Sequence, residues 1–558
     1  MTRIVECVPN ISEGRNRDII DAVTGEIDKA PGVTLLDVDP GEDTNRTVIT
    51  FVGDPENIVE AALRLIAKAA ELIDMDKHSG AHARMGATDV CPFVPVSGVT
   101  MDDCVELAKK LGKRVGDELG IPVYLYEYAA ARPERRNLAD CRTGEYEGLK
   151  AREGIPEWEP DFGPFKFGRS GATAIGARDF LIAWNVNLNT RDAKIASRIA
   201  NRLREKGYAK MDPDNPRKFL RDKDGNVLFQ PGKFKDVKAV GWYIDSYKQA
   251  QISCNLVNYH VSPPHLVFDE ACRLADQFGV RVTGSELVGV IPLEAMLQAG
   301  RYFLRKQGVM TGVNESDIIR CAIQSMGLDQ ISPFDPQKNI IEYMIREPGH
   351  LTSMKISEFM DELASDSPAP GGGSVAALCG ALSAALASMV ASLTFGKKGY
   401  TKFNAEMDEM AVKAQGLKAR LVEYIDRDTE AFNQVMDAIR LPKKTPEQAQ
   451  ARERAIDEAN RGAARVPFDV LSLIPDVVKL AKIAAEKGNR NLTPDAGVAG
   501  LTSALAARGA AYNVRVNLQS LPDDDFSRKL KEDTDRILRE VDDIAAEIRR
   551  IIEGRLWD

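Results

Sequence analysis

The chain has 558 residues, more than one hydrophobic core usually serves, so we expect two to four domains. It is 44% hydrophobic and 28% charged, as ordinary globular proteins are. Its net charge of −9 at pH 7 excludes the basic footprint that nucleic-acid-binding proteins normally carry. The eight cysteines are scattered without a CxxC pair, which predicts reduced thiols and excludes a disulfide frame or a zinc ribbon.

The N-terminal residues, MTRIVECVPNISEG, lack the basic start, apolar stretch and cleavage site of a signal peptide, so we predict a cytoplasmic protein. The uncharged run 371–396 is long enough to raise the question of a membrane span. Because Ala, Ser and Gly dominate this run, a closely packed buried helix is favoured, and we predict no transmembrane segment.

Strand-like and helix-like patterns alternate through the first third of the chain, which predicts an α/β unit with mixed strand pairing. In chain order these are a strand at 2–9, a helix at 16–30, strands at 32–39 and 45–53, a helix at 55–75, a strand at 87–96, a helix at 101–119 and a strand at 121–130.

A second alternating unit follows. It comprises a strand at 180–189, a helix at 191–206, two strands within 237–261, a helix at 263–280 and a strand at 282–292. From Ser353 onward only helical patterns occur, as in an all-α domain. The stretch REPGHLTS, 346–353, is typical of a linker because it contains proline and glycine.

These patterns predict a multidomain fold class: two α/β subdomains with mixed sheets, followed by an all-α helical-bundle domain. The predicted boundaries are 1–180 and 181–330 for the subdomains, 331–353 for the linker and 354–558 for the helical domain.

The stretch DKHSGAHARMGATDVCPFVP holds His78 and His82 four residues apart. A metal pair would need both rings on one helix face, but Gly80 lies between them and no HExxH pattern is present. The stretch therefore indicates a loop between a helix and a strand, where α/β proteins often place reactive groups. A histidine there can take and return a proton near neutral pH, although two incidental histidines remain an alternative.

Long motifs resemble the formiminotransferase-cyclodeaminase family. In the first two units they are VECVPNISEGR, DKHSGAHARMGATDVCPFVPV and SGATAIGARDFLIAWNVNL; in the helical part they are SPAPGGGSVAALCGAL and DRDTEAF. The resemblance covers essentially the whole chain in the same domain order. It implies transfer of a formimino group from N-formimino-L-glutamate to tetrahydrofolate, then cyclodeamination of 5-formiminotetrahydrofolate to 5,10-methenyltetrahydrofolate and ammonia.

The resemblance also assigns roles to residues. It places the transferase's catalytic histidine at His82, which leaves His78 structural, and the cyclodeaminase acid at Asp428. Tetrahydrofolate is implied as a co-substrate, with no metal and no nucleotide, and no phosphate-loop motif is present. The implied folate-binding loop at 163–173 contributes Gly163, Pro164, Gly168, Ser170, Gly171, Ala172 and Thr173.

Further polar residues are candidates for binding substrate. Asp39 lies at a strand end and suits the formimino amidinium or a pterin N–H, Asn10 ends the first strand, and Arg84 suits a substrate carboxylate. A turn acid, a loop asparagine and a surface ion pair are the respective alternatives. The helix start formed by Gly371, Gly372, Gly373 and Ser374 offers free N–H groups to a folate carboxylate; tight helix packing is its alternative.

Two other functions remain open: a formiminotransferase fused to a methenyltetrahydrofolate cyclohydrolase-like domain, and a folate-binding module with inactive sites. The expected partners are formiminoglutamate and polyglutamated tetrahydrofolate, with neither nucleic acid nor membrane. Because amphipathic helices bury their apolar faces better in pairs, we expect a homo-oligomer, at least a dimer.

Overall fold

The computed structural model describes residues 3–42, 44–80, 82–213, 215, 218–345 and 349–557. The chain forms two compact units. An α/β unit comprises Met1–Ala299 and Ala322–Arg346, and a helical unit comprises Gly300–Cys321 and Glu347–Asp558. Of the predicted linker, residues 346–348 lie outside the described part. The predicted fold class, two α/β subdomains followed by a helical domain, is confirmed.

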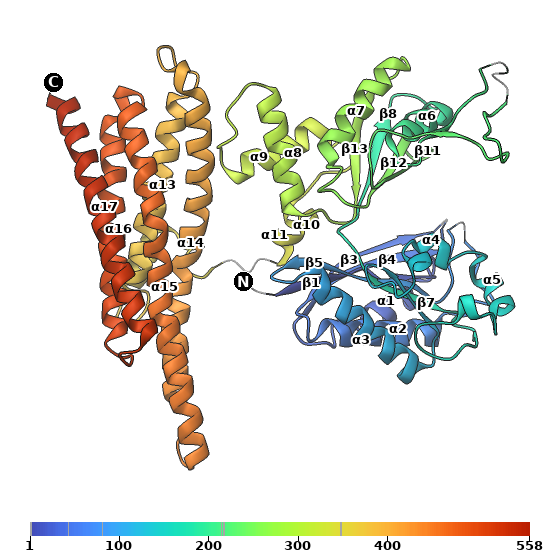
Figure 1. The fold of residues 1–558 in the computed structure, drawn as a ribbon, viewed down its shortest axis with the longest axis horizontal. Coiled ribbons are helices and arrows are strands. Elements are labelled where there is room, and N and C mark those ends of the chain that lie inside the picture. The colour runs from blue at the N-terminus through green and yellow to red at the C-terminus, as the bar shows by residue number, and fades with distance from the viewer. Residues whose placement is uncertain are drawn as a thin grey trace. The chain divides into compact units, whose positions relative to one another are not determined.

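The first subdomain is built on a seven-stranded sheet (Figure 1). Six strands have the order β1-β4-β2-β5-β7-β6, and the seventh strand, β3, pairs with β4. Its pairs are antiparallel except that β7 runs parallel to β5 and β6. The strands are β1 Ile4–Cys7, β2 Asn10–Ile11, β3 Val33–Gly41, β4 Arg46–Gly53, β5 Thr88–Ser97, β6 Val123–Glu127 and β7 Thr173–Ala177; the helices are α1 Arg17–Thr24, α2 Ile58–Leu72, α3 Met101–Leu119, α4 Leu138–Cys141 and α5 Glu145–Leu149.

Helix α1 and strand β7 of this subdomain differ from the sequence prediction. Helix α1 ends at Thr24 rather than continuing to residue 30, and Gly25 caps it. Strand β7 was not predicted, because a five-residue segment containing a glycine gives little periodicity. Its Gly176 is required by packing, since an added Cβ would lie 2.7 Å from the Tyr126 ring.

The second subdomain is a four-stranded antiparallel sheet with the order β11-β12-β8-β13. Helices α6 and α7 pack on one face, where the Trp184 ring of β8 lies 5.9 Å from that of Phe268. The elements are β8 Ile182–Leu188, α6 Ala193–Leu203, β9 Tyr208–Ala209, β10 Phe229–Gln230, β11 Val237–Ile244, β12 Gln249–Leu256, α7 Pro264–Gln277, β13 Val282–Val288, α8 Leu293–Lys306, α9 Glu315–Met326, α10 Pro336–Asn339 and α11 Ile341–Ile345.

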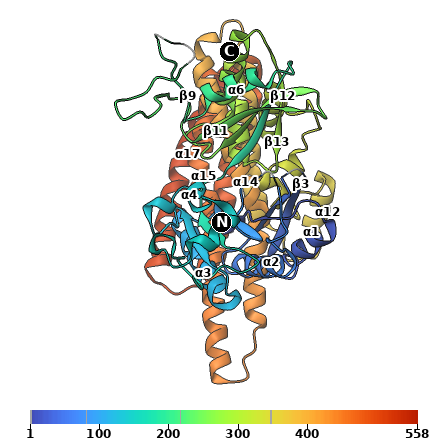
Figure 2. The ribbon, with the colours of Figure 1, turned by 90° about the vertical axis from the view of Figure 1, so that its right-hand side faces the viewer.

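The helical unit contains a bundle of long helices in which small residues allow close contact. An added Cβ at Gly500 of α16 would lie 2.8 Å from Ile548, and the Ser383 and Ser503 hydroxyls bond at 2.6 Å between α13 and α16. The adjoining ends of α14 and α15 project beyond the other helices (Figure 2). The helices are α12 Ile356–Leu363, α13 Gly372–Thr394, α14 Asn404–Arg440, α15 Pro446–Lys487, α16 Thr493–Leu518 and α17 Asp525–Trp557.

Among the described residues, α13 is the one helix that meets the length and hydropathy of a membrane span, and 61% of its most apolar window is buried. Its neighbours in the bundle are α14, α15 and α16. A core helix of a soluble protein has this composition and burial, as the sequence interpretation of the run 371–396 expected.

Candidate active sites

His82 lies in the loop between α2 and β5, and its hydrogen bond defines which ring nitrogen is reactive. Its Nδ1 lies 2.6 Å from the Ala83 carbonyl oxygen. A carbonyl only accepts, so Nδ1 carries the hydrogen and Nε2 keeps its lone pair. Among the described residues Nε2 has no hydrogen-bond partner. Burial, together with the positive charge of Arg46, lowers the pKa of His82 below its ordinary value, so the ring is a neutral base at pH 7.

His78 has the opposite arrangement, with both ring nitrogens engaged. Its Nε2 donates to the Asn45 carbonyl at 2.8 Å, and its Nδ1 accepts from the Arg84 Nε at 3.2 Å. A ring held on both sides connects chain segments and has no free position for a substrate proton. The two histidines thus differ in their chemistry although they lie four residues apart.

A buried carboxylate, Asp89, lies beside the His82 loop. Both Arg46 and Arg142 form ion pairs with it, and the Met85 amide donates to it at 2.9 Å. Burial alone would raise the pKa of Asp89, but the charges and hydrogen bonds of the two arginines outweigh it and lower that pKa. Asp89 is therefore an anion, and it holds two cations close enough to act on His82.

Asn10 and Asp39 share one row of the sheet. Both pair with Val48 of β4, Asn10 from β2 and Asp39 from β3. The Asn10 side chain also accepts from Arg46 Nε at 3.0 Å, which connects this row to the arginine that acts on His82. Asn10, Asp39 and the His82 loop therefore belong to one region of the first subdomain.

Asp39 also interacts with the second subdomain. Partial desolvation and repulsion from Glu286 of β13 raise the pKa of Asp39. Burial and repulsion from Asp39 raise the pKa of nearby Asp37. The Glu286 carboxylate is fixed by Tyr247, whose hydroxyl donates at 2.9 Å. Both sheets of the α/β unit thus contribute carboxylates to one region, which suits a cationic group such as an amidinium.

Arg84, the predicted carboxylate-binding residue, has its donors engaged within the protein. It is 7% exposed, and its guanidinium bonds to both Glu145 and Glu147 as well as to the ring and carbonyl of His78. All five of its N–H groups are used in these contacts. Arg84 therefore fixes the part of the loop around His78, which precedes His82. Its binding of a substrate carboxylate stays a prediction.

The predicted folate-binding loop runs along the residues that follow His82. The Ala87 amide donates to the Ser170 carbonyl at 2.8 Å, and the Ala172 amide donates to that of Met85 at 3.0 Å. Gly171 has a φ of +70° and no room for a Cβ, which would lie 2.2 Å from the Met85 oxygen. The other predicted residues divide into exposed Gly163, Pro164 and Gly168 and buried Thr173, where β7 begins.

The helical unit places Asp428 of α14 against the start of α13. The Ser374 hydroxyl lies 3.3 Å from its carboxylate, and an added Cβ at Gly373 would lie 2.0 Å from it. Gly371 is the N-cap of α13 and Gly372 its first residue, close to Asn513 of α16. Burial raises the pKa of Asp428 above its ordinary value although the Ser374 hydrogen bonds oppose the rise, so the carboxyl holds a proton more readily than a surface acid.

The neighbouring acid of the DRDTEAF motif has a different environment. Asp426 accepts from the Leu351 amide at 2.7 Å and from the Thr352 hydroxyl at 2.8 Å. It therefore anchors the segment that precedes α12, whereas Asp428 faces the glycine-rich helix start.

Comparisons with known proteins find relatives for both units of the chain. The model of the "Formiminotransferase domain, N-terminal subdomain" matches residues 4–178, that of the "Formiminotransferase domain" matches 183–346, and that of "Formiminotransferase-cyclodeaminase" matches 355–536. Formimidoyltransferase-cyclodeaminase of Rattus norvegicus is 42% identical over 559 residues and covers 100% of both chains. The chain belongs to the formiminotransferase-cyclodeaminase family.

Single-function relatives match the two halves of this family's chain separately. Glutamate formimidoyltransferase of Thermoplasma acidophilum is 43% identical over 55% of the chain and 95% of its own length. Methenyltetrahydrofolate cyclohydrolase of Methylorubrum extorquens is 41% identical over 36% of the chain and 97% of its own length. The chain therefore joins a formiminotransferase domain, which contains His82, to a cyclodeaminase domain, which contains Asp428.

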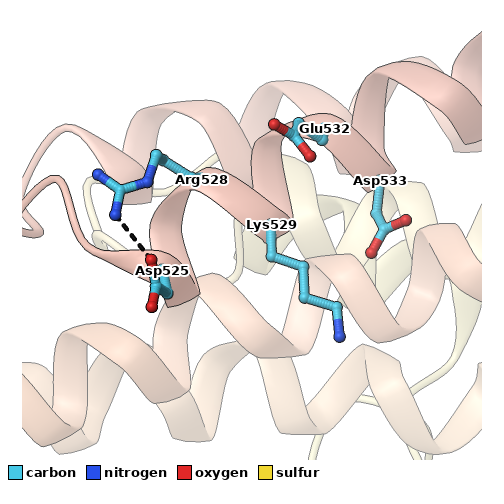
Figure 3. A pocket seen from close by; sticks show the side chains of 5 residues that line it. All are labelled: Asp525, Arg528, Lys529, Glu532 and Asp533. Atoms are coloured by element: carbon cyan, nitrogen blue, oxygen red, sulfur yellow. Dashed lines mark hydrogen bonds and ion pairs between the residues drawn. The ribbon is translucent and has the colours of Figure 1, made fainter.

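Metal-ligand clusters and surface hollows are two further places where a protein can hold a ligand. Within the described residues, no group of three or more His, Cys, Asp or Glu side chains is placed to hold a metal ion. A surface hollow of the cyclodeaminase domain is lined by the charged side chains Asp525, Arg528, Lys529, Glu532 and Asp533 (Figure 3). All five come from the first turns of α17, and Arg528 already pairs with Asp525 at 2.7 Å, as on a solvated helix face.

Sequence reasoning missed Arg46, Asp89, Arg142 and Glu286 of the formiminotransferase domain. Asp89 lies within the motif that carries His82, so a buried acid directly after the loop was a signal that pattern reading could have used. The arginines lie 43 and 53 residues away from Asp89, and only the folded sheet brings them to it.

The pKa of His82 leads to a prediction for the formimino transfer reaction. Because burial and the charges of Arg46 and Arg142 lower this pKa, the acidic limb of the kcat/KM profile lies below the ordinary histidine value of about 6.5. Activity is lost as pH falls through this limb, since the imidazole then becomes protonated. Arg142→Met removes one repelling charge, so the limb moves to higher pH. Arg114→Met, which removes a guanidinium paired with Glu60 and Glu118, leaves the limb in place.

Proposed function

We propose that the chain transfers the formimino group of N-formimino-L-glutamate to tetrahydrofolate, and then converts 5-formiminotetrahydrofolate to 5,10-methenyltetrahydrofolate and ammonia. The observation that carries the proposal is the pair of dissimilar proton-transfer groups, one in each domain. One is a neutral imidazole whose Nε2 has no hydrogen-bond partner among the described residues, and the other is a buried carboxyl with a raised pKa. The full-length match to a formimidoyltransferase-cyclodeaminase supports having both reactions in one chain.

In the transfer step, N5 of tetrahydrofolate attacks the formimino carbon and must lose a proton. His82 Nε2 is available to take it, because Nδ1 holds the hydrogen that bonds to Ala83. The glutamate nitrogen must gain a proton to leave, and the imidazolium can return the same one. Asp39 and Glu286 supply negative charge for the amidinium of formiminoglutamate.

In the cyclodeamination step, N10 of the folate attacks the same carbon, loses a proton, and expels the former formimino nitrogen as ammonia. Asp428 is suited to carry this proton, since burial makes its carboxyl a better proton acceptor than an exposed one. The glycines at the helix start Gly371–Ser374 leave room for the Asp428 carboxylate beside the first amides of α13. Free amides at a helix start can bind a folate carboxylate, so this arrangement supports folate binding close to Asp428.

We also propose that the enzyme is cytoplasmic and uses polyglutamated tetrahydrofolate as co-substrate. It requires no metal and has no nucleic-acid or membrane partner in this proposal. A second candidate for the helical domain is a methenyltetrahydrofolate cyclohydrolase activity, favoured by the 41% identity of that domain to such an enzyme. Ammonia release from 5-formiminotetrahydrofolate supplied directly separates the two, because a cyclohydrolase acts only on the methenyl product.

His82→Ala should lower the rate of formimino transfer by about two to four orders of magnitude, because it removes general acid–base catalysis. Ammonia release from added 5-formiminotetrahydrofolate should stay near the wild-type rate. His260→Ala is the control, since this histidine is exposed and contacts the Tyr259 ring. A fully active His82→Ala enzyme would show that another group moves the proton.

Asp428→Asn should stop cyclodeamination while transfer continues, so that 5-formiminotetrahydrofolate and glutamate accumulate without ammonia. The amide keeps the size and polarity of the side chain but cannot carry the proton. Asp426→Asn is a matched control two residues away: it weakens the hydrogen bonds to Leu351 and Thr352 and should lower the melting temperature while deamination persists. Normal ammonia release by Asp428→Asn would contradict the assignment.

We further propose that the chain is a homo-oligomer that associates through α13 and α16. These neighbouring helices expose an apolar stripe, with Leu501 66% and Tyr512 63% exposed. The members of the stripe are Leu382, Leu393, Val498, Leu501, Leu505, Tyr512 and Val516. Exposed apolar stripes of this length on packed helices are typical of subunit interfaces.

Light scattering at micromolar concentration tests this association. The native chain should be at least a dimer, and Leu501→Glu with Leu505→Glu should shift it to a smaller species, because charges would be buried unpaired in the interface. Leu441→Glu, at the exposed end of α14, is the control that should leave the mass unchanged. A monomeric native chain would remove the proposal.

A further inference from the structure

The second sheet of the formiminotransferase domain has one apolar and one polar face. Along β8, Trp184, Val186 and Leu188 alternate with Asn185 and Asn187. The first set packs with the helices, as the Trp184–Phe268 contact shows, so the asparagines lie on the opposite face. This face is lined largely by amide side chains, so it contributes less to the apolar core than the face covered by the helices.

One row of this polar face crosses three strands and carries an aromatic ring. Trp242 of β11 pairs with Gln251 of β12, which pairs with Asn187 of β8. The Trp242 indole N–H donates to Gln251 at 3.1 Å, the Gln251 amide to Asn187 at 2.7 Å, and the Asn187 amide to Gln330 at 2.6 Å. The row is therefore a continuous chain of hydrogen bonds that ends on the indole.

Trp242 is exposed although its partners are not. Gln251 is 1% and Asn187 0% exposed, whereas Trp242 is 42% exposed. The hydrogen bond satisfies the only polar atom of the indole, so the accessible part of the side chain is its apolar ring. A ring that is held in one orientation and left accessible is preorganised to stack on a flat partner, because little rotamer freedom remains to be lost.

Two charge interactions show that this face is turned toward the catalytic subdomain. Lys238 lies four residues before Trp242 on β11, hence on the same face, and its charge acts on Glu127 at the end of β6. Glu286, at the other edge of the sheet, acts on Asp39 of β3. Both edges of the polar face therefore lie near strands of the first sheet. The Glu286 row crosses β11 at Val240, two residues from Trp242, and Gln251 of the Trp242 row donates to the Glu286 carboxylate at 3.2 Å. The Trp242 row therefore adjoins the carboxylate that acts on Asp39.

We propose that Trp242 is a binding residue for the folate co-substrate, on which one of its flat aromatic rings stacks. The inference rests on the proposed function and assigns it a contact in the second subdomain. The folate offers two such rings, the pterin and the p-aminobenzoyl group, and both have the chemistry that an accessible indole recognises. The net charge of −9 argues against a nucleic-acid base as the partner.

Steady-state kinetics of the full chain test the contact. Trp242→Leu removes the ring and should raise the KM for tetrahydrofolate about tenfold, while Trp242→Phe keeps a ring and should raise it only about twofold. The KM for formiminoglutamate should stay within about twofold of the wild-type value in both variants. A wild-type KM for tetrahydrofolate in a folded Trp242→Leu enzyme would overturn the inference.

Tryptophan fluorescence supplies a readout that does not need turnover. Titration with 5-formyltetrahydrofolate should quench the native chain, and Trp242→Phe should lose most of that quench, whereas Trp557→Phe, which alters a residue 86% exposed in α17, should keep it. An equal quench in Trp242→Phe and the native chain would overturn the inference.

The same assay with a tetrahydropterin lacking the tail, and with p-aminobenzoylglutamate, tells which ring stacks. Quenching by either one, dependent on Trp242, supports the contact and identifies its source; quenching by neither overturns it. If the native chain binds folate through Trp242 but transfers no formimino group, the proposed function fails while the contact stands.

Discussion

The buried carboxylate of Asp89 is the constraint on which the transferase site depends. An unpaired carboxylate at a fully buried position would cost several kcal/mol, so it requires the cations of Arg46 and Arg142. Those cations then have two further effects. Arg46 holds the Asn10 side chain, and both arginines disfavour a protonated His82. Burial of the ring and these two cations together thus keep the base unprotonated at pH 7.

The two domains tune their proton-transfer groups in opposite ways. In the transferase, burial and neighbouring cations lower the pKa of a histidine, which keeps it neutral and basic at pH 7. In the cyclodeaminase, burial raises the pKa of Asp428, which makes a carboxyl a better proton acceptor. The rise brings Asp428 closer to the range where a proton is both taken and returned, whereas the fall keeps His82 unprotonated and ready to accept one.

Residues that are close in sequence have different roles because their surroundings differ. His78 and His82 differ because one ring bonds on both sides and the other keeps a free nitrogen. Asp426 and Asp428 differ because successive positions on a helix face different neighbours, a chain segment for the first and the start of α13 for the second. In both pairs one residue holds chain segments together and the other faces a candidate site.

The sequence by itself determined many of the strands and helices, the three-part architecture, the loop around His82 and the family, because periodicity and long motifs report local backbone and ancestry. It did not reveal β7, whose five residues lack a clear period. Only the tertiary structure showed that the N–H groups of Arg84 bond within the protein and that Arg46 and Arg142 both pair with Asp89. It also showed that Trp242 lies at the end of a row of buried amides. These partnerships join residues tens of positions apart, and strand order, which no local pattern encodes, decides which of them meet.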